Sequence, residues 1–400
     1  MGMIARQKIA AWFFALLWVE LILIPGSFAA EEALKSLNTV KVGYLFDFTG
    51  PMAGLGLAAE QRLAFDLFMQ DHKASGGFMV GEKKYMIEPV IYDDKGIAEG
   101  IREATNRLAV KDSVKFIAWE MTDSGILAMH PIIQQNKVLT LGGGATKAVL
   151  NPQITYYFRV YPPQDQIGPL MYDWLAKHMP HVKKIAILTY DESAGRAIAP
   201  RARERAAKHG FEIVDAVLTP RAQQDFTAEL TRIRNKNPDI IDTSSGPTAL
   251  IVKQARDMGY NVPILNYAGF HPLAVTKTIG WSALEGVISH AVDPEDPSLN
   301  PNFANYVRRV QRAGGQGGWW AFSVYNASWV LVQAMEKANS LDPTKVRDVL
   351  ETSEFNVIEG TKARFGGKEI YGMNHQLYRP VYMSIIEKGK VKNIAVLEFK

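Results

Sequence analysis

Two loops in the sequence carry residue types at a spacing that could bind a small polar molecule. The segment WEMTDSG (residues 119–125) offers hydroxyl and carboxylate side chains, and LTLGGGATK (residues 139–147) places three glycines directly before Ala145 and Thr146. Backbone N–H groups at the start of a helix are unpaired and carry partial positive charge, so a glycine-rich loop there can hold a carboxylate or another acceptor. The same glycines could instead form a tight turn that needs unusual dihedral angles. The sequence leaves both interpretations open.

The rest of the sequence offers no catalytic or metal-binding set. The eight histidines include no HExxH pair, no serine stands in a G-x-S-x-G frame, and there is no GxxxxGK[ST] motif and no GxGxxG after the first predicted strand. The chain has no cysteine, which excludes a thiolate zinc site and a cysteine nucleophile. We therefore expect no catalytic residue, no metal and no cofactor. An exported enzyme is the weaker alternative, because no nucleophile, base or metal set meets the geometry that such a site needs.

The composition is typical of a globular chain with two domains or lobes. The 400 residues are 47% hydrophobic and 22% charged, and 45 basic against 41 acidic residues leave a formal net charge of +4. The basic residues are scattered along the chain and do not line one stripe, so we expect no nucleic-acid partner. The length exceeds that of one ordinary domain, which predicts two lobes.

The first thirty residues have the pattern of an export signal. Two basic residues precede an apolar run over residues 9–24, and small residues follow at Ala29 and Ala30. An uncleaved membrane anchor is the alternative, but the run is shorter than the roughly 20 apolar residues of a span and Glu20 interrupts it. We expect residues 1–30 to be removed as a signal peptide and the mature protein to reside in the periplasm.

The segments that must position the two loops alternate between strand-like and helix-like patterns. From TVKVGYLF (residues 39–46) onward, β-rich runs are followed by apolar residues at helical spacing, and the pattern restarts at KKIAILTYD (residues 183–191). This alternation predicts an α/β fold with two doubly wound lobes, each built on a parallel sheet. A predicted helix over residues 319–338 and a predicted hairpin around Gly389 cannot bury themselves as a unit, so we expect them to return to these lobes.

Breaks in this pattern predict where the chain passes between the lobes. Proline-containing stretches interrupt the alternation at residues 156–169 and 290–301. Together with the C-terminal hairpin they predict three connecting strands, near Tyr161, Ala291 and Arg379. The expected lobes are residues 38–161 with 292–378, and residues 162–291 with 379–400.

Loops that follow strands and lead into helices are the places where open parallel sheets bind their ligands. Four predicted loops have this position: residues 46–56, 119–125, 142–147 and 190–195. Aromatic side chains in loops can pack against a ligand, whereas those on the long predicted helix are more often core residues. The aromatic side chains singled out on this basis are Trp119, Tyr267 and Phe270, and Tyr190 is the first residue of the fourth loop.

Several segments, in the same order along the chain, are similar to those of a known family. The most specific are QDFTAELTRIRNKNPD (residues 224–239) and KQARDMG (residues 253–259), and similarity extends from VKVGYLFDFTGPMAGLG near the N-terminus to AFSVYNASWVLVQAMEKA near the C-terminus. They resemble type I periplasmic substrate-binding proteins of ABC importers, in the branched-chain amino acid and amide binding group. The resemblance implies two α/β lobes joined by three hinge strands that close on a small organic ligand and deliver it to an ABC permease in the inner membrane. We expect a monomer.

The resemblance also implies which residues contact the ligand. In the family, the loops similar to TDSG and GGGAT bind the ligand carboxylate through hydroxyl and backbone N–H groups, and the stretch after the first hinge contributes further contacts. With the loop aromatics, the candidate ligand-binding residues are Trp119, Thr122, Asp123, Ser124, Gly144, Ala145, Thr146, Tyr161, Gln164, Tyr190, Tyr267 and Phe270.

Three positions depart from the amino-acid binders of this family. Ala194 and Ala268 stand where those proteins have a tyrosine and an acidic residue that serve the ammonium group, and a buried ammonium without a counter-charge is costly. Asp123 stands where a hydroxyl is expected and would repel a ligand carboxylate. An α-amino acid is therefore disfavoured, whereas aromatic acids, amides and other small polar organics stay open, and Glu120 or Asp123 could favour a cationic group. A periplasmic sensor that presents its ligand to a membrane receptor is the alternative function.

Overall fold

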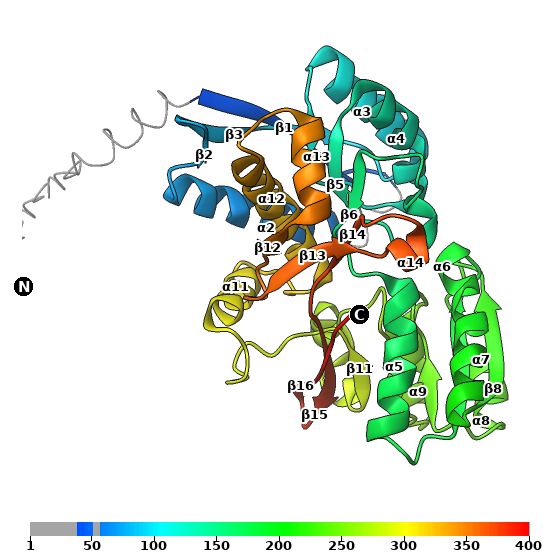
Figure 1. The fold of residues 1–400 in the computed structure, drawn as a ribbon. Coiled ribbons are helices and arrows are strands. Elements are labelled where there is room, and N and C mark those ends of the chain that lie inside the picture. The colour runs from blue at the N-terminus through cyan, green and yellow to red at the C-terminus, as the bar shows by residue number, and fades with distance from the viewer. Residues whose placement is uncertain (1–37, 51–56, 400) are drawn as a thin grey trace, which may run out of the picture. The chain divides into compact units, whose positions relative to one another are not determined.

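The computed structural model describes residues 38–50 and 57–399, which fold around two mainly parallel β-sheets with helices packed on their faces (Figure 1). This is the predicted α/β fold class. The export signal predicted for residues 1–30 lies outside the described residues. Within the described ranges, no helix combines the length and the apolar character that a membrane span requires.

The first sheet has nine strands among the described residues. Its central strands pair in parallel, and antiparallel strands extend both edges. In order across the sheet the strands are β12 (Glu354–Asn356), β13 (Lys362–Gly366), β14 (Gln376–Tyr378), β6 (Tyr157–Arg159), β5 (Leu139–Gly142), β4 (Phe116–Ile117), β1 (Asn38–Phe46), β3 (Lys83–Asp93) and β2 (Phe78–Val80).

The second sheet has seven strands in the described part of the chain. In order across the sheet they are β16 (Lys390–Leu397), β15 (Val381–Glu387), β11 (Val287–Ser289), β10 (Ile264–Leu265), β9 (Ile240–Asp242), β7 (Lys184–Tyr190) and β8 (Glu212–Thr219). Strands β15 and β16 form the predicted hairpin, with Lys388 and Gly389 in the two-residue turn at φ values of 52° and 70°. Turns with two positive φ values match the twist of the flanking strands, which explains the glycine.

Helices cover both faces of each sheet because the strands alternate between two apolar sides. On β1, Val42, Tyr44 and Phe46 belong to one core cluster, which includes residues of the long helix predicted at 319–338, whereas Leu45 belongs to another. Strands buried on both faces are expected in parallel sheets. The helices are α2 (Leu57–Ala74), α3 (Ala98–Asn106), α4 (Asp123–Asn136), α5 (Gln164–His178), α6 (Ser193–Arg196), α7 (Ile198–His209), α8 (Thr227–Arg234), α9 (Thr248–Asp257), α10 (Thr276–Ile279), α11 (Pro301–Arg312), α12 (Trp319–Ala338), α13 (Pro343–Thr352) and α14 (Lys368–Tyr371).

The chain passes between the two sheets three times within the described residues. It leaves the first sheet after β6, returns after β11, and leaves again between β14 and β15. Arg379, on the last of these connections, is buried and forms an ion pair with buried Glu359. Its Nε also donates to the carbonyl of Val160, on the first connection, at 3.4 Å. The boundaries given for the two lobes stay a prediction.

Candidate functional site

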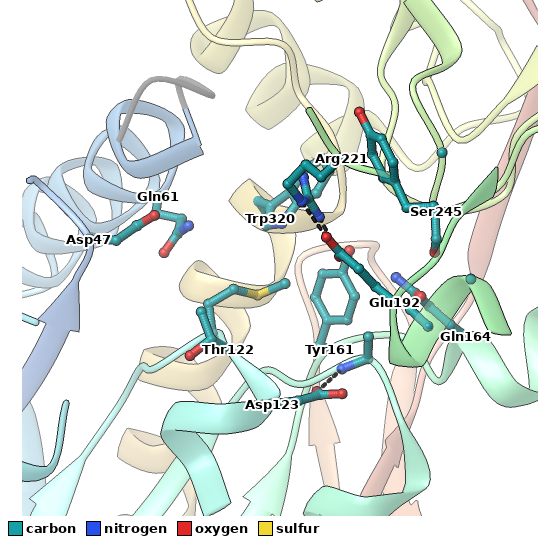
Figure 2. A pocket seen from close by; sticks show the side chains of 17 residues that line it. Asp47, Gln61, Thr122, Asp123, Tyr161, Gln164, Glu192, Arg221, Ser245 and Trp320 are labelled. Carbon is teal, nitrogen blue, oxygen red and sulfur yellow. Dashed lines mark hydrogen bonds and ion pairs between the residues drawn. The ribbon is translucent and has the colours of Figure 1, made fainter. Parts of the chain in front are cut away.

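A cavity of about 290 Å³ lies where loops from the two sheets converge (Figure 2). Strand β1 lies between β3 and β4, and strand β7 lies between β8 and β9, so the order of strands changes direction across the sheet at β1 and at β7. Such switch points are where α/β sheets bind ligands. From loops that follow strands of the first sheet, the lining includes Asp47, Thr122, Asp123, Ala145, Tyr161 and Gln164. From loops of the second sheet it includes Tyr190, Glu192, Ala194, Arg221, Ser245 and Gly269, and helices α2 and α12 add Gln61 and Trp320.

The two loops singled out in the sequence lie side by side and are joined by Asp123. Thr122 caps the N-terminus of α4 by accepting a hydrogen bond from the N–H of Gly125 at 3.2 Å, so Asp123 is the first residue of the helix. The Asp123 carboxylate accepts one hydrogen bond from the N–H of Ala145 at 2.6 Å and one from the N–H of Thr146 at 3.2 Å. Figure 2 marks the contact of Asp123 with this loop. The backbone N–H groups that were predicted to bind a ligand group therefore donate to a carboxylate of the chain itself.

Backbone geometry and a buried arginine hold this loop in place. Gly144 has a φ of 85°, and a Cβ at this position would lie 2.9 Å from both methyl carbons of Val149. Arg159 is fully buried, and its Nη1 donates to the carbonyl of Thr146 at 2.8 Å. The same guanidinium forms an ion pair with Asp165 at 3.4 Å. The turn interpretation and the cradle interpretation of the glycines are thus both part of one arrangement.

Three polar side chains are buried on another part of the wall. In each of them, one polar atom has no hydrogen-bond partner among the described residues. These atoms are Nε2 of Gln61, the hydroxyl of Tyr161 and Nε1 of Trp320, whose residues are 1%, 0% and 4% exposed. The oxygen of Gln61 accepts a hydrogen bond from Nε1 of Trp119 at 2.5 Å. An indole nitrogen can only donate, so the Gln61 oxygen is the acceptor of this bond and the Gln61 amide nitrogen is the atom without a partner. Burial raises the pKa of Tyr161 and outweighs the opposite effect of the Gln164 side chain, so the hydroxyl stays protonated and can donate.

A third group on the wall pairs its charges internally. Arg221 lies over the ring of Tyr190, with 4.5 Å between the guanidinium carbon and the ring centroid. Its Nη2 donates to the Glu192 carboxylate at 2.6 Å, and this contact raises the pKa of Arg221. Burial raises the pKa of Tyr190. This group resembles the Asp123 loop in that its charges are compensated within the chain.

Acidic side chains gather beside and behind the cavity wall. Asp47 lines the cavity, and burial raises the pKa of its carboxyl group. Burial, with the nearby carboxylates of Asp47 and Asp93, raises the pKa of Asp94 to about 7. Burial and the carboxylate of Asp94 also raise the pKa of Glu120. Within residues 38–50 and 57–399, no group of three or more histidine, aspartate or glutamate side chains is arranged to hold a metal ion.

The structure brings half of the predicted site residues to the cavity. Those that line it are Thr122, Asp123, Ala145, Tyr161, Gln164 and Tyr190. Ser124, Gly144 and Thr146 belong to the same two loops but do not line it, and Trp119, Tyr267 and Phe270 are buried elsewhere. Trp119 acts on the cavity only through its bond to Gln61, and Phe270 lies in the apolar core of the second sheet. The assignment of ligand contacts to all twelve residues stays a prediction.

Sequence reasoning missed other lining residues, for two reasons. Arg221 and Ser245 follow β8 and β9, so the rule that selected the other loops could have found them. Gln61 and Trp320 lie on α2 and α12, and no local signal separates them from core positions of the same helices.

Comparison with known proteins assigns the chain to a family. A family model described as "Periplasmic binding protein" matches residues 39–390. The chain belongs to the periplasmic binding protein family. This family comprises non-enzymatic solute-binding proteins of ABC transporters, so the chain is a solute-binding protein and not an enzyme.

Individual members of the periplasmic binding protein family are distant in sequence and similar in fold. The "Leucine-, isoleucine-, valine-, threonine-, and alanine-binding protein" of Pseudomonas aeruginosa is 23% identical over 337 residues, covering 81% of this chain and 85% of that protein. The substrate-binding protein LivJ of Streptococcus pneumoniae, solved with isoleucine, is 19% identical with a TM-score of 0.76 and covers 90% of this chain and 100% of its own. A solute-binding protein of Rhodopseudomonas palustris, solved with 3,4-dihydroxybenzoic acid, is 22% identical with a TM-score of 0.75 and covers 90% and 97%. At these identities the structures establish the fold alone.

Proposed function

We propose that this protein is the exported solute-binding subunit of an ABC importer, which captures a small polar organic molecule between two lobes and delivers it to a permease in the inner membrane. The observation that carries this proposal is the cavity of about 290 Å³ at the switch points of both sheets. Its size is at the lower end of the range for small-molecule pockets, which favours a ligand no larger than an amino acid or a single substituted aromatic ring. The relatives that bind isoleucine and dihydroxybenzoic acid have ligands of this size.

The ligand is captured because residues from both sheets contact it. Residues after β1 and β4 contact one side of the ligand, and residues after β7 and β8 contact the other. A ligand that bridges both sides stabilises the arrangement in which the two sides are close, to the extent that it binds this arrangement more tightly. The connections near Tyr161, Ala291 and Arg379 are the segments that absorb the motion. The protein works as a monomer in the periplasm after removal of residues 1–30.

Thermal denaturation tests ligand capture directly. A panel of small acids, amides and amines is added to the purified mature protein, and a ligand at 100 times its Kd raises the free energy of unfolding by about 2.7 kcal/mol. Ala194→Trp places a large side chain on the cavity wall and abolishes the increase in Tm. Ala228→Trp, at an exposed position of α8, is the matched control and retains it. If no member of the panel raises the Tm, the proposed capture of a small molecule is wrong.

Delivery to a permease is tested in cells. Deletion of the gene abolishes high-affinity uptake of the molecule that raises the Tm, and a plasmid that encodes the full chain restores it. The Ala194→Trp variant, produced to the same level in the periplasmic fraction, fails to restore uptake. Unchanged uptake in the deletion strain would contradict the transport role and leave ligand capture standing.

A further inference from the structure

We propose that the cavity selects a neutral or cationic ligand that has no free carboxylate, and that it binds a carbonyl-type oxygen of this ligand through Gln61, Tyr161 and Trp320. The proposal names the ligand class of the same cavity and therefore rests on the proposed function. Three observations carry it: the occupied backbone cradle, the charge balance of the wall, and the unpartnered buried donors.

The backbone cradle is filled by the chain itself. Both oxygens of Asp123 accept hydrogen bonds from the loop N–H groups, at 2.6 Å from Ala145 and 3.2 Å from Thr146. A ligand carboxylate at the same N–H groups would have to displace Asp123, leaving a carboxylate with fewer donors next to a second carboxylate. Two like charges at such a distance oppose each other strongly. The donors that suit an anion are therefore not available to the ligand.

The charges along the cavity wall also disfavour an anion. The charged side chains that line the cavity in the described part of the chain are Asp47, Asp123, Glu192 and Arg221, which are three acidic groups and one basic group. Glu192 and Arg221 compensate each other through their ion pair. The remaining acidic groups make the cavity favour a neutral or positively charged guest.

The unpartnered donors are the groups that bind the ligand. Nε2 of Gln61, the hydroxyl of Tyr161 and Nε1 of Trp320 are buried and lack a partner among the described residues. A buried donor without an acceptor is unfavourable, so an acceptor on the ligand removes a cost that the ligand-free protein carries. In Figure 2 the Gln61 amide nitrogen is turned toward the side of the cavity where Trp320 lies. All three donors are uncharged, so a carbonyl or amide oxygen accepts from them without an unpaired charge being buried in the cavity.

Matched pairs of ligands test the class. Isothermal titration calorimetry on the wild-type mature protein compares benzoate with benzamide and leucine with leucinamide. We expect the amide to bind at least tenfold more tightly than the acid. A carboxylate that is preferred in either pair overturns the proposal. The proposed capture function would survive that result, since its own failure is the absence of any Tm increase across the whole panel.

Opening the cradle tests the role of Asp123. Asp123→Ser removes the internal carboxylate and leaves a hydroxyl beside the N–H groups of Ala145 and Thr146, so benzoate and leucine gain at least tenfold in affinity over the wild type. The control Asp165→Asn changes a buried carboxylate of the same network that does not line the cavity, and gives no such gain. Absence of any gain in Asp123→Ser overturns the proposal that Asp123 excludes carboxylates.

A pair of neighbouring tryptophans tests the donor cluster. Trp319 and Trp320 are both buried with an unpartnered Nε1, but only Trp320 lines the cavity. Trp320→Phe lowers the affinity for benzamide about tenfold, and Trp319→Phe changes it less than twofold. Equal effects of the two substitutions overturn the donor role, because they would then act through packing alone.

Discussion

Two parts of the same cavity wall differ in whether their hydrogen-bond donors have an acceptor within the chain. In the loop pair around Asp123, the backbone donors of Ala145 and Thr146 already have an acceptor from the chain. In the cluster of Gln61, Tyr161 and Trp320, three buried donors have none among the described residues. Native proteins pair nearly all buried polar groups, so a paired group contributes to the fold and an unpaired group at a cavity is available to a ligand. Proximity to the cavity alone does not make a residue a recognition residue.

The largest expected effect tests whether the occupied part of the wall is structural. Arg159 is fully buried and supports the loop through Thr146 and Asp165. Arg159→Met leaves the carboxylate of Asp165 without its cationic partner, and we expect the free energy of unfolding to fall by about 3–5 kcal/mol in urea denaturation. Arg102→Met removes an exposed ion pair with Glu99 and is the control, with a change below about 1 kcal/mol. Equal changes in the two variants would contradict a structural role for this wall.

The second effect is a pH dependence that arises behind the wall. Asp94 has a pKa of about 7 in the folded protein, raised by burial and by the carboxylates of Asp47 and Asp93, and Glu120 also lies near it. The unfolded chain releases this proton near pH 4 and the folded chain retains it. The contribution to stability is therefore complete below pH 4 and falls, by at most about 4 kcal/mol, as the pH rises to about 7.

The variant Asp94→Asn isolates this contribution. The asparagine does not titrate, so the difference in the free energy of unfolding between the wild type and the variant decreases from pH 4 to pH 7. Urea denaturation at one-unit pH intervals measures it. A constant difference over this range would show that Asp94 titrates near its usual value and is ionised behind the wall at neutral pH.

The smallest effect compares the two parts of the wall in the ligand-free protein. Asp123→Ala removes the acceptor of two backbone N–H groups, and we expect the free energy of unfolding to fall by about 1–2 kcal/mol. Trp320→Phe removes a donor that had no partner, which offsets the lost apolar contact, so the change is below about 1 kcal/mol. Urea denaturation of both variants gives the comparison. A larger loss for Trp320→Phe than for Asp123→Ala would reverse our interpretation of the wall.

Regular elements of the fold were predictable because their signals are local. The helix at residues 319–338 was predicted from its apolar content and is α12 with the same bounds, and the hairpin around Gly389 is β15 and β16. Strands β12 and β13 were missed, because each is short and is defined by its antiparallel pairing, β12 with β13 and β13 with β14, more than by its own sequence. The alternation of strands and helices was sufficient to predict the parallel part of each sheet.

The sequence by itself determined the α/β class, the parallel strands of both sheets and the loops that hold most of the polar lining, since periodicity, glycines and strand ends are properties of neighbouring residues. Only the tertiary structure decided what those groups do. Asp123 reaches Ala145 across 22 positions of the chain, and Gln61 and Trp320 reach the cavity from helices far apart in sequence. Whether a hydrogen-bonding group is paired or left for a ligand depends on partners that folding brings together, so it cannot be deduced from the residue and its neighbours.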